Sequence, residues 1–104
     1  MSNLTVFTIS DGSISKHESV LTATKQPEEE TFLKYEDETE ETVSGTIFGS
    51  KPAPKVWINP VYKGPVEHYE NIRYLMTHPA NIFLDCEDGR RYYSGGTILR
   101  VAVE

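Results

Sequence analysis

Carboxylates are the chemically active side chains that this sequence gathers most densely. Residues 28–41 hold eight of the sixteen Asp and Glu residues of the 104-residue chain and one lysine, a local net charge of −7. Because the whole chain has a formal charge of −6, the other ninety residues sum to +1. A surface with this density of carboxylates attracts cationic partners and repels anionic ones. The sequence therefore confines charge-dependent chemistry to one short acidic segment, residues 28–41.

Two roles are open to the acidic segment. Charges on a strand edge or loop tip keep a β-sheet protein soluble, because they block pairing between the edges of two sheets. Alternatively, the carboxylates steer the chain onto a basic groove of a partner protein, and this is our leading hypothesis. The residues expected to bind that partner are Glu18, Tyr35 and the acidic residues of the segment, namely Glu28, Glu29, Glu30, Glu36, Asp37, Glu38, Glu40 and Glu41.

The geometry of a strand permits carboxylates to imitate nucleic acid. Alternate residues on one face of a strand lie about 6.6 Å apart. Successive phosphates along one nucleic-acid strand repeat at a comparable roughly 7 Å along the chain. Acidic residues on one face could thus occupy the groove of an enzyme that binds nucleic acid.

One short stretch has a likeness to a known family. His17-Glu18-Ser19-Val20-Leu21, followed at Pro27 by Glu28, Glu29 and Glu30, resembles the Gln-Glu-Ser-Ile-Leu and Pro-Glu-Glu stretch of phage uracil-DNA glycosylase inhibitors, which are small acidic DNA mimics. The resemblance implies that Glu18 and Ser19 contact the enzyme and that Val20 and Leu21 form part of the docking strand edge. It covers residues 17–30 only, with a longer spacing to the proline. The N-terminal helix of that family is missing, because Leu4–Ile9 predicts a strand, so we do not assign the chain to the family.

Histidine and cysteine give no pattern typical of an active site. His68 and His78 are ten residues apart, which matches no local metal-ligand spacing, and we expect all three histidines, including His17, to be surface or loop residues. Cys86 is the only cysteine, so no intrachain disulfide can form, and its acidic neighbours disfavour the thiolate. We expect no metal, no cofactor and no enzyme activity. An enzyme would require His17, His68, His78, Asp85 and Cys86 to meet in space.

Arg90-Arg91-Tyr92-Tyr93 combines cations with rings that could stack on single-stranded nucleic acid. A chain with a charge of −6 repels the phosphate backbone, however, so we expect no direct binding of nucleic acid. Gly95-Gly96 lies between two expected strands and is typical of a turn rather than of a phosphate-binding loop.

Hydropathy and the N-terminus bear on location. No run approaches the roughly 18 apolar residues of a membrane span, and Met1-Ser2-Asn3-Leu4 lacks the features of a secretory signal. With a single cysteine, these features favour a soluble protein of the cytoplasm, which would be the host cytoplasm for a phage-encoded chain.

The spacing of apolar residues, and the Gly, Pro and Asp residues that interrupt them, predict mostly strands. Apolar or β-branched runs bounded by Gly, Pro and Asp indicate short strands, with a tight hairpin turn at Asp11-Gly12. Within residues 65–76, apolar and aromatic side chains recur at steps of three and four residues. This spacing predicts one short helix that ends before Pro79. The expected strands are 4–9, 14–24, 31–35, 41–48, 56–58, 82–84, 90–94 and 97–103.

These elements predict a single domain, residues 1–104, that is mainly β. Seven or eight short strands with one short helix favour a small antiparallel barrel or sandwich, with an α+β fold as the near alternative. The leading functional hypothesis is a non-enzymatic inhibitor or adaptor, phage-like in character, that docks its acidic surface on a protein such as a nucleic-acid-binding enzyme. The alternative is a structural module, such as a small virion component, that self-associates through strand edges.

Overall fold

Antiparallel strands make up the regular structure of the residues that are described. The computed structural model describes residues 4–51, 53–59, 67–78, 81–86, 89–94 and 96–103. Within these ranges no helix is long and apolar enough to cross a membrane. The strands of the described ranges are β1 (Thr5–Ser10), β2 (Ser13–His17), β3 (Val20–Gln26), β4 (Glu30–Tyr35), β5 (Glu40–Ser44), β6 (Thr46–Lys51), β7 (Ala53–Asn59), β8 (Glu67–His78), β9 (Asn81–Cys86), β10 (Gly89–Ser94) and β11 (Thr97–Ala102).

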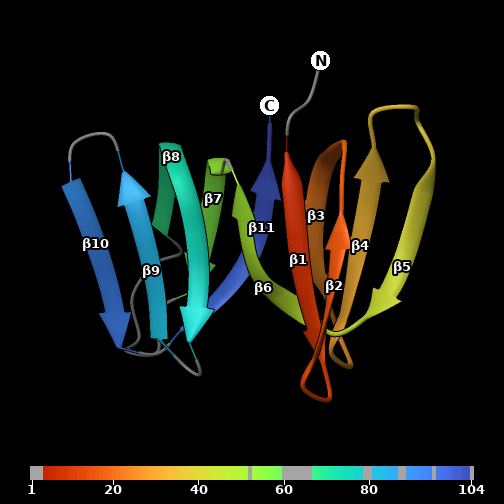
Figure 1. Cartoon of the computed structure of the whole chain (residues 1–104), viewed down its shortest axis with the longest axis horizontal. Helices are drawn as coiled ribbons and strands as arrows, with labels where there is room; N and C mark the ends of the chain where they lie inside the picture. Colours follow the sequence, from red (N-terminus) through yellow and green to blue (C-terminus); the bar gives the residue numbers. More distant parts are fainter. Residues whose placement is uncertain are drawn as a thin grey trace.

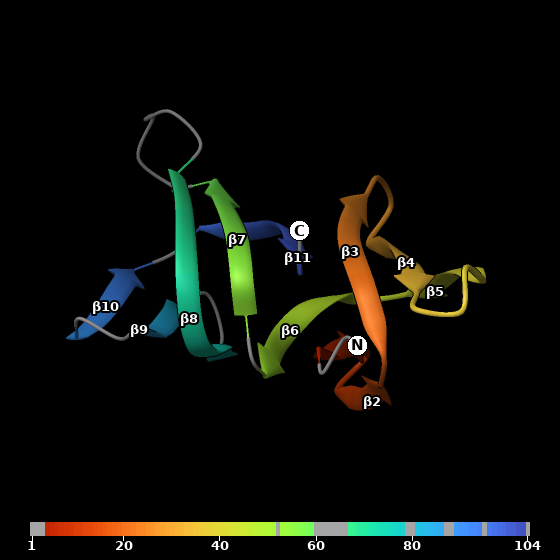
Figure 2. The same cartoon turned by 90° about the horizontal axis from the view of Figure 1, so that it is seen from above.

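The strands form two layers that share the long strand β8. One layer runs β2-β1-β6-β8-β9-β10 and the other runs β5-β4-β3-β11-β7-β8. The layers diverge at β8 because its first half pairs with β7, whereas its second half lies between β9 and β6. Figure 1 shows the first layer in front with β3, β7 and β11 behind it, and Figure 2 shows the two layers from above.

The prediction of a mainly β, antiparallel fold is confirmed. The ladders of the described residues do not close into a barrel. Strand β1 has β2 and β6 as its two neighbours and β3 has β4 and β11, so β1 and β3 do not pair with each other. Away from β8, a backbone hydrogen bond also joins the layers at the start of β3, where the N–H of Val20 donates to the carbonyl oxygen of Leu4 at 3.1 Å.

The predicted helix over residues 65–76 is wrong. Residues 67–76 belong to β8, and the residues before Glu67 lie outside the described ranges. A β-bulge between Ile72 and Tyr74 shifts the register of β8 against β9. The extra residue leaves Arg73 and Tyr74 exposed between buried Ile72 and Leu75. Since a bulge interrupts the two-residue alternation of a strand, it creates the three-residue step from Ile72 to Leu75, which resembles the spacing of a helix.

The predicted count of seven or eight strands is too low. The expected strand 14–24 is two strands, because the chain breaks at Glu18 and Ser19, where Ser19 adopts a left-handed φ of 57°. The tight turn at Asp11-Gly12 is confirmed, with φ angles of 50° and 80° in the left-handed region that such hairpins require.

The core lies between the two layers. Leu4, Val6, Val20, Leu33 and Ile58 are among its fully buried side chains, and they come from both layers. Buried apolar area is the main favourable term in folding. Leu33 therefore anchors β4 in the core, and the polar residues at the two ends of β4 face solvent.

Candidate functional site

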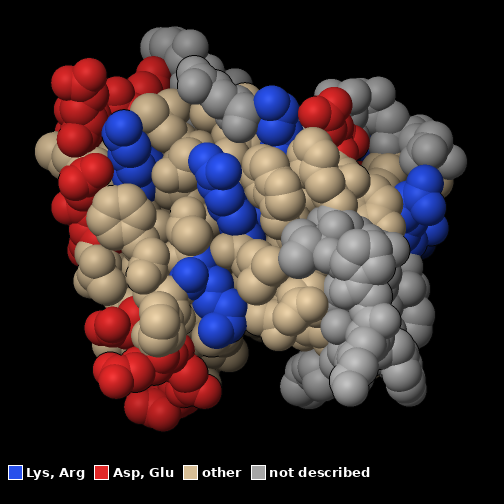
Figure 3. All heavy atoms as spheres, turned by 180° about the vertical axis from the view of Figure 1, so that it is seen from behind, with Lys and Arg blue, Asp and Glu red and all other residues tan. Residues whose placement is uncertain are grey.

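The acidic segment does not form a single surface. Glu28 and Glu29 occupy the turn between β3 and β4, Glu30 begins β4, and the remaining acidic residues follow Tyr35 at the other end of that strand. At ~3.3 Å per residue, the two ends of β4 are about 17 Å apart. Figure 3 shows acidic side chains gathered at the top and at the bottom of one side of the molecule.

The larger group surrounds the turn between β4 and β5 and extends to the turn between β2 and β3. The N–H of Glu36 donates to the carbonyl oxygen of Ser19 at 2.8 Å, and this hydrogen bond joins the two turns. Glu18 therefore lies beside a turn that is far from it in sequence. We call this group the acidic hairpin cluster; its members are Glu18, Glu36, Asp37, Glu38, Glu40 and Glu41.

Hydrogen bonds hold the β4–β5 turn in one conformation. The N–H of Tyr35 donates to the carbonyl oxygen of Thr39 at 2.9 Å, and the N–H of Glu38 donates to that of Tyr35 at 3.0 Å. Asp37 accepts hydrogen bonds from the N–H and the hydroxyl of Thr39 at 3.1 and 2.5 Å. These bonds favour the charged carboxylate, so they lower the pKa of Asp37. The turn thus presents the Asp37 carboxylate ionised and in a fixed position.

Few cations offset the cluster. Lys16 lies 3.1 Å from Glu18, but both side chains are mostly exposed, so this pair contributes little free energy. Lys34 lies opposite Glu40 in the ladder between β4 and β5. All six members of the cluster are exposed. A cluster with six carboxylates and two nearby lysines retains a strongly negative field.

A polar network connects the cluster to the interior. The Tyr35 hydroxyl donates to Oε2 of Glu41 at 2.6 Å and lies 3.4 Å from Nδ1 of His17, while Nε2 of His17 lies 3.0 Å from the Thr8 hydroxyl. Burial and, second, the bond to Glu41 raise the pKa of Tyr35 to about 12. Burial lowers the pKa of His17, with Glu41 acting in the opposite sense. Both groups therefore stay neutral near pH 7.

His17 belongs to this site, although the sequence indicated only a surface or loop residue. Its side chain is half-buried and contacts residues nine and eighteen positions away. A clue in the sequence is the alternation of Ser13, Ser15 and His17, which puts His17 on one face of β2. That face could not be assigned to the interior without the register that places His17 opposite Val6.

An open depression lies at the centre of the cluster. Glu18, Ser19, Tyr35, Glu36, Asp37 and Thr39 line a space of about 590 Å³. Its walls come from both turns, so it depends on the hydrogen bond between Glu36 and Ser19. Three of the lining residues, Glu18, Glu36 and Asp37, carry carboxylates, so the depression suits a cationic group.

The other candidate groups lie elsewhere. His68 stacks on Trp57 with 4.6 Å between ring centroids, and Cys86 is buried beside Asp85. In the described ranges no three His, Cys, Asp or Glu residues are placed to hold a metal ion. The side chains of His78, Tyr92 and Tyr93 lie outside what the structure describes, as does Gly95.

The resemblance at residues 17–30 implies a docking edge that β3 does not provide. Val20 is fully buried, and β3 pairs with β4 on one side and β11 on the other. In comparisons with known proteins, no family model matches the chain, and neither a curated protein nor a solved structure matches it.

Proposed function

We propose that this chain is a non-enzymatic binding domain that docks its acidic hairpin cluster on a basic groove of a partner protein. The partner's class would be proteins whose groove holds nucleic acid, since a dense group of carboxylates offers such a groove negative charges in place of phosphates. The observation that carries the proposal is the hydrogen bond between Glu36 and Ser19, which joins carboxylates of two turns into one surface.

The pre-formed conformation of the turn supports this proposal. Binding costs free energy when loops and side chains must be ordered on association. Here the backbone bonds of Tyr35, Glu38 and Thr39 order the turn before any partner arrives. The interaction of Tyr35 with Glu41 adds a partly apolar ring to the negative surface. A rigid acidic surface with an aromatic neighbour favours specific docking over general attraction.

The two acidic groups of the chain provide a matched test. Glu36→Gln, Glu38→Gln and Glu40→Gln together remove three charges from the cluster, and Glu28→Gln, Glu29→Gln and Glu30→Gln remove three from the opposite end of β4. Tagged wild-type protein and both variants would be used to capture proteins from the source cells, followed by mass spectrometry. We expect a protein captured by the wild type to be lost with the first variant and kept with the second.

A competition experiment separates mimicry from other acidic docking. Duplex DNA added to the captured complex should release the partner, because both ligands would occupy the same groove. Equal loss of the partner with both charge variants would show that net charge alone, and not the cluster, attracts the partner. Retention of the partner by the cluster variant would overturn the proposal.

Self-association through strand edges is the second candidate function. It is favoured by β2, whose edge carries Ile14 with 54% of its surface exposed. Charged residues oppose it, because Lys16 on β2 and Glu40 on β5 discourage pairing between sheet edges. Size-exclusion chromatography with light scattering distinguishes the candidates: a defined oligomer without any partner would favour assembly, and a monomer would favour the binding domain.

A further inference from the structure

A second surface, at the opposite end of the molecule, combines exposed apolar side chains with arginines. Tyr74 and Met76 on β8 and Phe83 on β9 are exposed by 39%, 41% and 37%. The register pairs Met76 with Phe83 and Tyr74 with Asp85, which puts these side chains on one face. With Arg90 and Arg91 they line a groove of about 290 Å³. We call it the arginine–aromatic groove.

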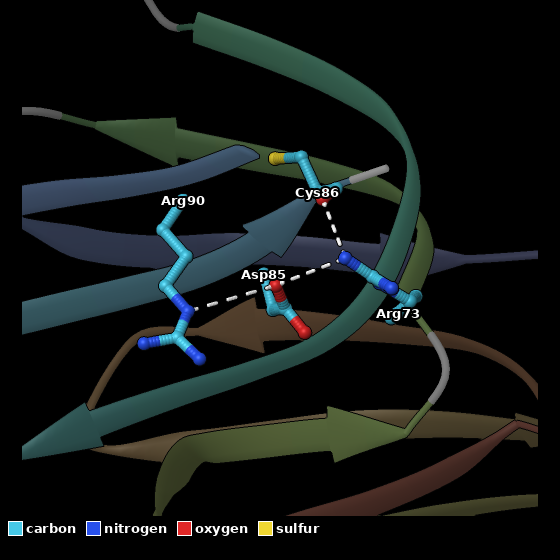
Figure 4. A network of polar contacts seen from close by, with 4 residues as sticks. All are labelled: Arg73, Asp85, Cys86 and Arg90. Carbon is cyan, nitrogen blue, oxygen red and sulfur yellow. Dashed lines mark hydrogen bonds and ion pairs between the residues drawn. The ribbon is translucent and has the colours of Figure 1, made fainter. Parts of the chain in front are cut away.

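The arginines beside this groove share one carboxylate. Arg73 lies 3.4 Å from Oδ1 of Asp85 and also donates to the carbonyl oxygen of Cys86 at 3.2 Å, while Arg90 lies 4.0 Å from the same Oδ1. Figure 4 shows the two guanidinium groups approaching Asp85 from β8 and β10. Asp85 is largely buried, whereas Arg90 is 84% exposed. Among the described residues, one carboxylate cannot neutralise two guanidinium groups, so Arg73 and Arg90 leave positive charge on the exposed side.

We propose that the arginine–aromatic groove binds single-stranded nucleic acid. Tyr74 and Phe83 offer rings on which unpaired bases can stack, and guanidinium groups pair with phosphate oxygens in a bidentate manner. Stacking on aromatic side chains requires bases that are free of a duplex, so a single strand fits this groove better than double-stranded DNA. The proposal does not depend on the function proposed for the acidic hairpin cluster.

The sequence suggested that the net charge of −6 would repel the phosphate backbone. At this groove the repulsion is weak, because the residues of the acidic hairpin cluster are distant from it. Strand β5 and strand β10 lie at opposite ends of the longest dimension in Figure 1, and that dimension is 34 Å. The Debye length at physiological ionic strength is about 8 Å, so charges at one end are screened from a ligand at the other. Glu87 and Asp88, which follow Cys86 in the sequence, are outside the described residues.

The experiment measures fluorescence anisotropy of a labelled oligothymidylate of about twelve nucleotides, a length in the range that single-strand sites cover. We expect binding at low salt that weakens as salt rises, and weaker binding of a duplex of equal length. Phe83→Leu keeps an apolar side chain without a ring and should weaken binding by about fivefold or more. Arg90→Gln should reduce the slope of log K against log salt by about 0.7, the value for one lost phosphate contact.

Controls decide between specific and general attraction. Lys34→Gln removes one positive charge from β4 and should leave the affinity unchanged at physiological ionic strength, where charges on β4 are screened from the groove. Circular dichroism and thermal unfolding confirm that each variant folds. The proposal is overturned by absence of binding at low salt, by equal weakening with Lys34→Gln, or by equally effective competition from poly-glutamate, which would indicate an acidic polypeptide as the ligand.

Discussion

Tyr35 links the acidic surface to the interior of the protein. Its hydroxyl donates to Glu41 and lies close to His17, which in turn meets Thr8. Each member comes from a different strand, so the network depends on the register of four strands rather than on any local motif. Individual side chains of this network should therefore affect stability as well as binding.

Replacing Tyr35 by Phe removes one hydroxyl and leaves the ring in place. We expect the free energy of unfolding to fall by about 0.5–1.5 kcal/mol, the usual net value of one hydrogen bond. Urea unfolding measures this change. Glu41→Gln keeps an acceptor for the hydroxyl and should cost less; an equal or larger loss would show that the charge of Glu41, rather than the bond, matters.

Protonation of His17 should destabilise the fold in mild acid. Burial lowers the pKa of His17 in the folded chain, while in the unfolded chain the pKa is near 6.5. The unfolded chain therefore binds more protons between these values, so the stability due to neutral His17 is complete above about pH 6.5 and is lost as pH falls toward the folded pKa.

Unfolding in urea at pH 7.5 and pH 5 tests whether the stability falls as the pH is lowered. The wild-type protein should lose more stability between these pH values than His17→Gln, which cannot be protonated. Carboxylate titration is common to both proteins and cancels in the comparison. Identical pH dependence of the two proteins would rule out a contribution from His17.

At the scale of elements, close backbone contacts fix where strands can turn. Gly45 separates β5 from β6 with a φ of 112°, its N–H donates to the carbonyl oxygen of Glu29 at 2.6 Å, and its carbonyl oxygen accepts from the Thr31 hydroxyl. A Cβ at this position would lie 2.4 Å from the carbonyl oxygen of Ile9. The path from one layer to the other thus requires a glycine here.

Gly45→Ala should destabilise the protein by at least about 1–3 kcal/mol, because it combines backbone strain with a collision against fixed backbone. Gly12→Ala is the matched control, since Gly12 also has a positive φ, 80°, but no atom lies within 4 Å of its Cβ position. Thermal unfolding compares the two variants. Equal losses would mean that strain alone, and not the contact with Ile9, accounts for the effect.

The turn between β3 and β4 holds two glutamates in an unfavourable backbone conformation. Glu28 and Glu29 have φ angles of 63° and 57°, a left-handed pair that Asn-Gly adopts more readily. Glu28→Asn with Glu29→Gly should stabilise the protein by about 1 kcal/mol, measured by urea unfolding. Glu28→Gln with Glu29→Gln removes the same charges without the turn preference, and an equal gain there would assign the effect to charge.

Two charged features of the described residues lie far apart in the molecule. The acidic hairpin cluster and the arginine–aromatic groove lie at opposite ends of the longest dimension. Within the cluster, like charges repel in the folded state and lower its stability. Added sodium chloride screens this repulsion, so the midpoint of thermal unfolding should rise between low and moderate salt.

The variant with Glu36, Glu38 and Glu40 changed to Gln should be more stable than the wild type at low salt and should respond less to salt. Differential scanning calorimetry at several salt concentrations measures both effects. An undiminished response of the variant would place the salt-sensitive charges outside the cluster.

Much of the fold was predictable from local patterns. The strand at residues 4–9, the turn at Asp11-Gly12 and the strand at 31–35 follow from alternation and turn chemistry, which depend only on neighbours in sequence. The helix prediction for 65–76 failed because a bulge at Arg73 imitates helical spacing, and a bulge is visible only against its partner strand. The break at Ser19 was missed because serine carries no strong signal for a left-handed conformation.

The amino-acid sequence by itself determined that the protein is mainly β and that residues 28–41 carry a net charge of −7, against −6 for the whole chain. Only the tertiary structure decided how that charge is distributed. Because β4 spans the segment, Glu28–Glu30 lie at one end and Glu36–Glu41 at the other, where Glu18 joins them through the bond between Glu36 and Ser19. Charge is a property of composition, but proximity arises from strand register, which depends on contacts between residues far apart in the chain.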